Sequence, residues 1–375
     1  DWGEGSLTES GYPRVAKRWK RGTPLAKATT IFEGRHEDIG IWPRVMDSGE
    51  ETIALVDQSL TFFTGAYHVI GPDGKLTSLP LQESADLAGF YAGRLLFTLR
   101  EAWEVDGQTH AQGALLAINA AVFQATGKLP SIETIYTPDE RTSIEGVTVS
   151  RSGLYVTLLQ NVKGRILRFS VNPQSSQWSS KLVPLPENGT VSISAAGPHS
   201  DTIFINYEDH VTPDRLSEFD AGANKLSTLK SLAARFDAGV LEVHQHMAKS
   251  ADGTAVPYFV IHRKGLKPDG STPTILYGYG GFEISLKPRY SATIGKLWLE
   301  RGGAYAVANI RGGGEFGPRW HKAALKTERQ RAYDDFIAVG EDLAKRGITS
   351  PKHFGISGGS NGGLLVGTIF TQRPD

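Results

Sequence analysis

The sequence predicts two units of different fold class within one chain of 375 residues. Short apolar runs separated by turn residues fill the chain as far as about residue 233, which indicates β structure almost throughout. After Leu232 the apolar residues also recur at helical spacing, so the rest of the chain is expected to mix strands with helices. Near the end, a glycine-rich turn at Ser360 stands between a predicted strand and a predicted helix.

The first unit, residues 1–233, is expected to be a β-propeller. Its runs are rich in β-branched and aromatic residues, and turn signals such as Pro-Asp-Gly at 72–74 separate them, a pattern shared by sandwiches, barrels and propellers. More than 200 residues is long for one sandwich, whereas blades of roughly 40–50 residues would fit about five times. Residues 108–127 are expected to form strands and turns. The other strands expected include residues 52–56, 61–63, 94–99 and 154–159.

The second unit, residues 234–375, is expected to be an α/β domain. A hairpin is predicted from a strand ending near residue 250 and its partner at 256–262. A helix is predicted from Tyr333 to Arg346, with Gly347 as its C-cap. Further strands are expected at 274–277, 304–309 and 353–357, and a last helix at 363–370.

Composition excludes several classes of protein. Lys+Arg and Asp+Glu are both 40, so the overall charge does not favour nucleic acid or an anionic membrane. There are no cysteines, which excludes disulfides, thiol catalysis and cysteine metal sites. No run approaches the roughly 18 apolar residues of a membrane helix. We therefore expect neither a nucleic-acid partner nor a membrane partner.

The glycine-rich turn fits the nucleophile-elbow pattern G-x-S-x-G, with Ser360 at its centre and Gly358 and Gly362 on either side. The glycines lack the side chains that would crowd such a turn. The amide of Asn361 opens the following helix and points to where an oxyanion would form. The alternative is a strand-to-helix turn without catalysis, for example one that binds phosphate. A phosphate loop at 311–314 is a weaker alternative, because it lacks the Gly-Lys-Ser/Thr ending.

Several longer stretches resemble the prolyl oligopeptidase family of serine peptidases. The catalytic domain of that family is similar to six segments of the chain, namely residues 277–282, 308–315, 333–336, 350–352, the elbow and 372–375. The propeller of its bacterial members has segments similar to residues 2–13 and 17–25. The resemblance implies an incomplete α/β-hydrolase domain preceded by an incomplete β-propeller, with about five of the family's seven blades.

The resemblance also implies a role for each matching residue. Ser360 would be the acyl-forming nucleophile, and the Tyr279 hydroxyl would join the Asn361 amide in the oxyanion hole. Phe282 would line the pocket for the substrate proline. Asn361 after the serine favours the prolyl branch over oligopeptidases that cleave at basic residues. No metal and no organic cofactor is implied.

The family's triad aspartate and histidine are expected beyond residue 375, so the chain is interpreted as an inactive internal fragment. All ten histidines precede Ser360. His321 is interpreted as a structural or surface histidine. His244 and His246 alternate along a strand and are expected to lack the further ligands of a zinc site.

The function expected is that of a serine endopeptidase that cleaves short peptides after proline through an acyl-enzyme, with the propeller limiting substrate size. The alternatives are an esterase, a dipeptidyl- or acylaminoacyl-type peptidase, or a non-catalytic scaffold in this form. The expected partners are short proline-containing peptides. The protein is expected to be a cytoplasmic monomer, with the periplasm as the alternative compartment.

Overall fold

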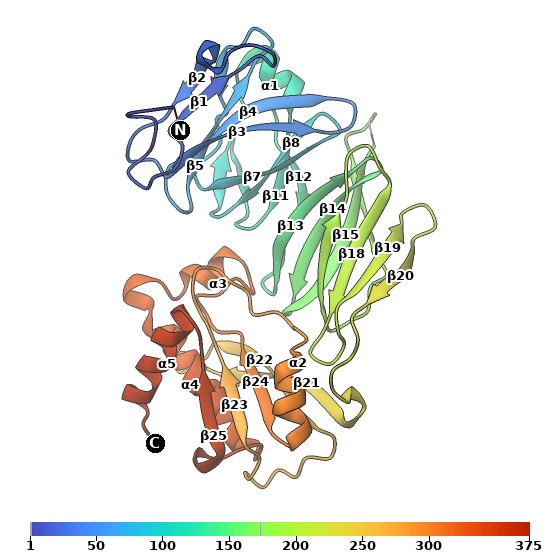
Figure 1. Ribbon diagram of the computed structural model, residues 1–375, viewed down its shortest axis with the longest axis vertical. Helices are drawn as coiled ribbons and strands as arrows, with labels where there is room; N and C mark the ends of the chain where they lie inside the picture. The colour runs from blue at the N-terminus through green and yellow to red at the C-terminus, as the bar shows by residue number, and fades with distance from the viewer. Residues whose placement is uncertain (1, 173) are drawn as a thin grey trace.

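A computed structural model describes residues 2–172 and 174–375 and contains both expected parts (Figure 1). The strands up to Ser231 form small antiparallel sheets, and a mixed sheet begins at Leu241. The predicted boundary at residues 233–234 falls in the interval between them. In Figure 1 the sheets nearest the N-terminus lie at the top, the green sheets at the right, and the mixed sheet below.

The β-propeller part holds four four-stranded blades and two two-stranded sheets among the described residues, arranged as an open array and not a closed ring. Each blade is an antiparallel meander. The first two-stranded sheet is β1 (Val15–Arg18) with β2 (Thr29–Glu33). The blades are β3 (Gly40–Asp47), β4 (Thr52–Ser59), β5 (Gly65–Ile70) and β6 (Leu76–Ser78); β7 (Ala85–Tyr91), β8 (Arg94–Leu99), β11 (Leu115–Asn119) and β12 (Glu133–Tyr136); β13 (Thr142–Ser150), β14 (Gly153–Gln160), β15 (Lys163–Val171) and β16 (Trp178–Leu182); and β17 (Thr190–Ala195), β18 (Thr202–Glu208), β19 (Arg215–Asp220) and β20 (Lys225–Ser231).

Strand β14 shows why these runs are apolar on both faces. Leu154, Val156 and Leu158 pack toward the preceding blade, while Tyr155 packs toward Ile203 of the following one. Alternate residues of a strand point to opposite faces, so a blade that lies between two others needs apolar side chains on both.

Two sequence predictions are wrong here. Residues 61–63 form the bend between β4 and β5 and not a strand, closed by a hydrogen bond of 2.7 Å between the hydroxyls of Thr61 and Thr64. The segment 108–127 contains helix α1 (Ala120–Thr126) besides β11 and the small hairpin of β9 (Trp103–Val105) and β10 (Gln108–His110). Asn119 caps α1 by accepting a hydrogen bond from the Val122 amide, a signal that the strand pattern obscured.

The α/β-hydrolase domain is built on a five-stranded sheet in the order β21-β22-β24-β23-β25. The first three strands of that order are antiparallel neighbours, and β24, β23 and β25 run parallel. The bounds are β21 (Leu241–Lys249), β22 (Ala255–Arg263), β23 (Thr274–Tyr277), β24 (Ala304–Ala308) and β25 (Phe354–Ser357).

Helices cover both faces of this sheet. Helices α4 (Gln330–Lys345) and α5 (Asn361–Gln372) pack on the face formed by Val256, Tyr258 and Val260 of β22. Helix α2 (Ala292–Leu297) packs on the other face, near Ile261. Gly347 ends the α4 region in the left-handed conformation (φ +71°), as its position in the sequence predicts. The remaining helical pieces are α3 (Pro318–Lys322) and the 3₁₀ turns Leu25–Lys27, Ala238–Val240, Leu299–Arg301, Lys326–Glu328 and Pro351–His353.

Candidate active site

Ser360 lies on the turn between β25 and α5, in a backbone conformation that residues other than glycine rarely adopt (φ 53°, ψ −120°). Strain of this kind costs of order 1–3 kcal/mol and collects at functional sites. The residue is exposed, and its hydroxyl makes no hydrogen bond within the described part of the chain. The predicted order of strand, serine turn and helix is therefore present.

The glycines on either side of the serine allow this turn to close. A Cβ on Gly362 would lie 2.7 Å from the carbonyl oxygen of Gly278, and one on Gly358 would overlap the carbonyl oxygen of Gly362. Both partners are main-chain atoms that cannot rotate away. The pattern G-x-S-x-G is thus a steric requirement at this turn.

Asn361 ties the elbow to the loop that follows β23. Its side-chain amide Nδ2 donates a hydrogen bond of 2.6 Å to the main-chain carbonyl of Tyr279. Its own backbone amide has no acceptor within the residues described, so this N–H stays free beside the serine. Tyr279 is half-buried, and its main chain lies directly against the elbow.

Arg329 reinforces the same junction, and the sequence offers no motif that would have identified it. One guanidinium nitrogen donates to the carbonyl of Gly280, and the other lies 3.4 Å from Oδ1 of Asn361. The guanidinium also lies over the ring of Tyr333, 5.3 Å from its centroid. Arg329 therefore holds the loop and the first residue of α5 together.

The loop continues into two consecutive strained residues. Phe282 and Glu283 have φ values of +52° and +57°. Phe282 is 58% exposed, so its ring is available to a ligand. Glu283 forms an ion pair with Arg100 of the β-propeller, whose guanidinium lies 4.3 Å from the ring centroid of Phe63. Contacts from a blade distant in sequence thus help to hold the backbone beside Phe282.

His321 lies beneath this loop and is buried. Its Nδ1 is 2.8 Å from the carbonyl oxygen of Gly312 and 3.1 Å from the amide nitrogen of Glu283. These contacts indicate a structural role for His321, in agreement with the sequence analysis. None of its hydrogen bonds within the described residues involves Ser360.

Glu315 anchors the far end of the loop. Its Oε1 accepts hydrogen bonds of 2.9 Å from the Leu286 amide and 3.3 Å from Nδ2 of Asn309. Complete burial raises the pKa of this carboxyl to about 7, because desolvation disfavours the charged form.

The loop at 311–314 is held by an ion-pair network around the buried Arg311. The Arg311 guanidinium binds Asp335 at 2.6 Å and Asp252 at 2.5 Å. Hydrogen bonding to Arg311 keeps the pKa of the Asp252 carboxyl well below its usual range. The guanidinium is therefore committed to carboxylates and not presented to a phosphate.

A cavity of about 800 Å³ lies between the propeller blades and the hydrolase loops. Arg100 and Glu145 line it from the blades, and Glu283, Lys287 and Arg319 line it from the hydrolase domain. Lys287 and Glu145 bridge it with an ion pair of 3.0 Å. Its lining contains neither Ser360 nor Tyr279, but it includes Glu283, the neighbour of Phe282.

Comparison with known proteins assigns the chain to a class that combines these two parts. Residues 288–375 match the profile of the prolyl oligopeptidase family, and residues 112–231 match that of the prolyl oligopeptidase N-terminal β-propeller domain. The chain belongs to the prolyl oligopeptidase family, a family of serine peptidases. The resemblance inferred from the sequence motifs is confirmed.

Individual relatives give the same assignment. The chain is 41% identical over 385 residues to an uncharacterized peptidase of Sinorhizobium fredii, covering 100% of this chain and 52% of that protein. It is 42% identical over 193 residues to a prolyl endopeptidase of Elizabethkingia miricola, covering 52% of this chain and 27% of that protein. It superposes on the structure of a post-proline cleaving enzyme from Rickettsia typhi with a TM-score of 0.89 at 30% identity, over 99% of this chain and 54% of that one. The chain thus spans about half the length of the Sinorhizobium and Rickettsia proteins.

None of the helices in residues 2–172 and 174–375 combines the length and the apolar character needed to cross a bilayer.

Proposed function

We propose that Ser360 is the nucleophile of a serine endopeptidase that cleaves short peptides on the carboxyl side of proline. The observation that carries the proposal is the strained, exposed serine at the start of α5, with a free Asn361 amide beside it and Tyr279 fastened to the same turn. In this reaction the serine oxygen attacks the carbonyl carbon while a base accepts its proton. The Asn361 N–H and the Tyr279 hydroxyl would stabilise the oxyanion, and the amine would leave to give an acyl-enzyme.

Specificity for proline rests on Phe282 and on the family. A flat, exposed aromatic ring suits the pyrrolidine ring of proline. The relative from Elizabethkingia is named a prolyl endopeptidase, and the solved relative from Rickettsia typhi a post-proline cleaving enzyme. The propeller blades and the cavity of about 800 Å³ behind Glu283 support a limit on substrate size.

The base and its acidic partner are proposed to come from sequence outside these 375 residues. The Ser360 hydroxyl has no hydrogen-bond partner in residues 2–172 and 174–375, and a serine without its base is nearly inert. This observation favours a second candidate for the 375-residue chain on its own, namely a non-catalytic scaffold. An esterase or a dipeptidyl- or acylaminoacyl-type peptidase would use the same elbow with a different preference.

The test uses a polypeptide of the relatives' full length that contains these residues. It should hydrolyse a chromogenic peptide with proline before the cut, and Ser360→Ala should abolish the hydrolysis. Full activity in Ser360→Ala would reject the nucleophile, and equal rates on peptides without proline would reject the specificity. A fluorophosphonate probe should label the long form strongly and the 375-residue chain weakly. Strong labelling of the short chain would show that a base is already present.

A further inference from the structure

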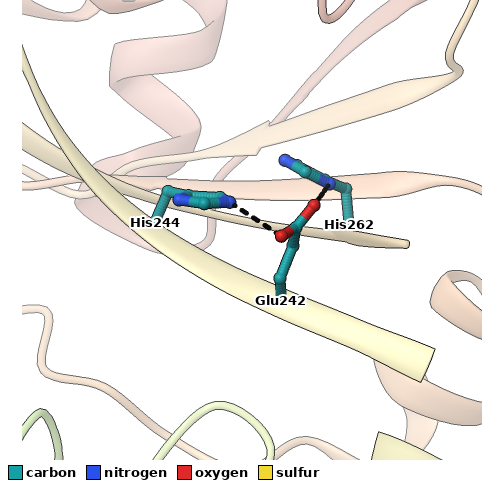
Figure 2. A group of neighbouring side chains, drawn as sticks. All are labelled: Glu242, His244 and His262. Atoms are coloured by element: carbon teal, nitrogen blue, oxygen red, sulfur yellow. Dashed lines mark ion pairs between the residues drawn. The ribbon is translucent and has the colours of Figure 1, made fainter. Parts of the chain in front are cut away.

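Three potential metal ligands meet on β21 and β22, at the opposite end of the sheet from Ser360. Glu242 and His262 are directly paired across the two strands, and His244 lies two residues along β21 from Glu242. Side chains two apart on a strand share a face, so all three project on the same side. Figure 2 shows the two imidazoles extending toward each other over the Glu242 carboxylate.

The separations fit one small cation after minor adjustment. One ligand atom from each residue lies within 4.8 Å of the others. Nε2 of His244 is 3.4 Å from a Glu242 oxygen, and Nδ1 of His262 is 3.5 Å from the other oxygen. Ligands bound to one tetrahedral zinc at about 2.0–2.2 Å lie roughly 3.3–3.5 Å apart. The two histidines must therefore approach each other, which rotation of the exposed His244 ring permits.

The nitrogen of His262 that faces Glu242 is also the one that is hydrogen-bonded to the main chain. Its Nδ1 donates a hydrogen bond of 2.8 Å to the carbonyl of Arg263. Binding of a metal through Nδ1 would replace this hydrogen bond and leave the ring proton on Nε2, since only an unprotonated imidazole nitrogen is a metal ligand. The side chain is buried, so its ring is fixed by packing before any ion arrives.

A stack of rings orients the second histidine. His244 stacks on His262 with a centroid distance of 5.2 Å, and on its other side it stacks on His246 at 5.8 Å. The sequence analysis expected His244 and His246 to lack the further ligands of a zinc site, whereas the structure places two potential ligands beside His244. Glu242 and His262 supply them, and the latter comes from the neighbouring strand.

We propose that Glu242, His244 and His262 bind a divalent transition-metal ion, with Zn²⁺ as the best match. Two imidazoles and a carboxylate are a ligand set typical of zinc, whereas Mg²⁺ and Ca²⁺ require oxygen ligands. The ion would join edge strand β21 to β22, so it would stabilise the hydrolase sheet without taking part in the reaction at Ser360. The fourth position would hold water, since Glu242 and His244 are partly exposed.

The test is calorimetric titration of the metal-stripped 375-residue chain with Zn²⁺, and with Mg²⁺ as a comparison. We expect one equivalent of Zn²⁺ to bind and Mg²⁺ to give no binding. His244→Ala and Glu242→Gln should each weaken Zn²⁺ binding by at least about tenfold. Both side chains are partly exposed, so both variants should melt at the wild-type temperature without metal, while only the wild type should melt higher with Zn²⁺.

The matched control is His199→Ala, which removes an exposed histidine paired with a carboxylate elsewhere, 2.8 Å from Asp47. This variant should bind Zn²⁺ like the wild type. Absence of Zn²⁺ binding by the wild type would overturn the proposal. So would binding that His244→Ala leaves unchanged, or that His199→Ala weakens equally.

Discussion

The hydrogen bond from Asn361 to Tyr279 gives the most direct test of how this site is assembled. Replacing Asn361 with alanine removes the 2.6 Å bond and leaves the half-buried Tyr279 carbonyl without its partner. Loss of such a bond costs about 1–2 kcal/mol. If that free energy serves to hold the Tyr279 hydroxyl in place, kcat/KM should fall about 5- to 30-fold, since 1.36 kcal/mol corresponds to a factor of ten.

A double-mutant cycle separates this positioning role from general damage. Tyr279→Phe should itself reduce kcat by about 10²–10³-fold, the usual effect of deleting an oxyanion donor. If Asn361 acts through Tyr279, adding Asn361→Ala to Tyr279→Phe should have little further effect. The assay is steady-state hydrolysis of a proline-containing chromogenic peptide by the long form of the protein.

The control is Asn206→Ala, because Asn206 is also half-buried and its Nδ2 bonds to Asp214 at 2.8 Å, but in a propeller blade. It should leave kcat/KM unchanged. The reasoning is refuted if Asn361→Ala alters kcat/KM less than twofold, or if its effect multiplies fully with that of Tyr279→Phe.

Three other perturbations follow from the same contacts. Asp335→Asn should destabilise the hydrolase domain by about 3–5 kcal/mol, because it leaves the buried Arg311 without its main partner; urea denaturation measures this, and a change below about 1 kcal/mol would contradict it. Burial raises the pKa of the Glu315 carboxyl from 4.5 to about 7, so folding binds a proton and the free energy of unfolding should fall as pH rises from 4.5 to 7. In Glu315→Gln the urea midpoint of unfolding should no longer show this fall. A pH dependence identical to that of the wild type would contradict the prediction. Glu283→Ala removes the partner of Arg100 and should raise KM more than it lowers kcat, whereas an unchanged KM would show that the strained loop needs no support from the propeller.

Most of the fold follows from local patterns. The helix from Tyr333 was predicted because its apolar residues have helical spacing, and Tyr333, Phe336, Val339 and Leu343 are indeed buried on one face. The hairpin of β21 and β22 was likewise predicted from its turn and strands. The strand predicted at residues 61–63 is wrong, because it rested on the strand propensity of two phenylalanines. Phe63 instead lies under the Arg100 guanidinium, a contact that no local pattern reveals.

The candidate site divides in the same way. Ser360, its glycines and the Asn361 amide could be predicted, because one short turn fixes their relative positions. Arg329 and Arg100 could not, since each reaches the site across a long interval of sequence and carries no motif. The group of Glu242, His244 and His262 could not be predicted for the same reason, because His262 joins His244 only through strand pairing.

The strained residues explain why these long-range contacts exist. Phe282, Glu283 and Ser360 all have positive φ, and each conformation would relax if its surroundings allowed it. Arg100 holds Glu283, while Asn361 and Arg329 hold the loop against the elbow. A loosened contact should therefore displace the proposed oxyanion donor and the exposed aromatic ring before it unfolds the domain. Substitutions at Arg329 should then lower activity more than stability. Asp335 makes no hydrogen bond to residues 278–283 within the described part of the chain, so its substitution should lower stability more than activity.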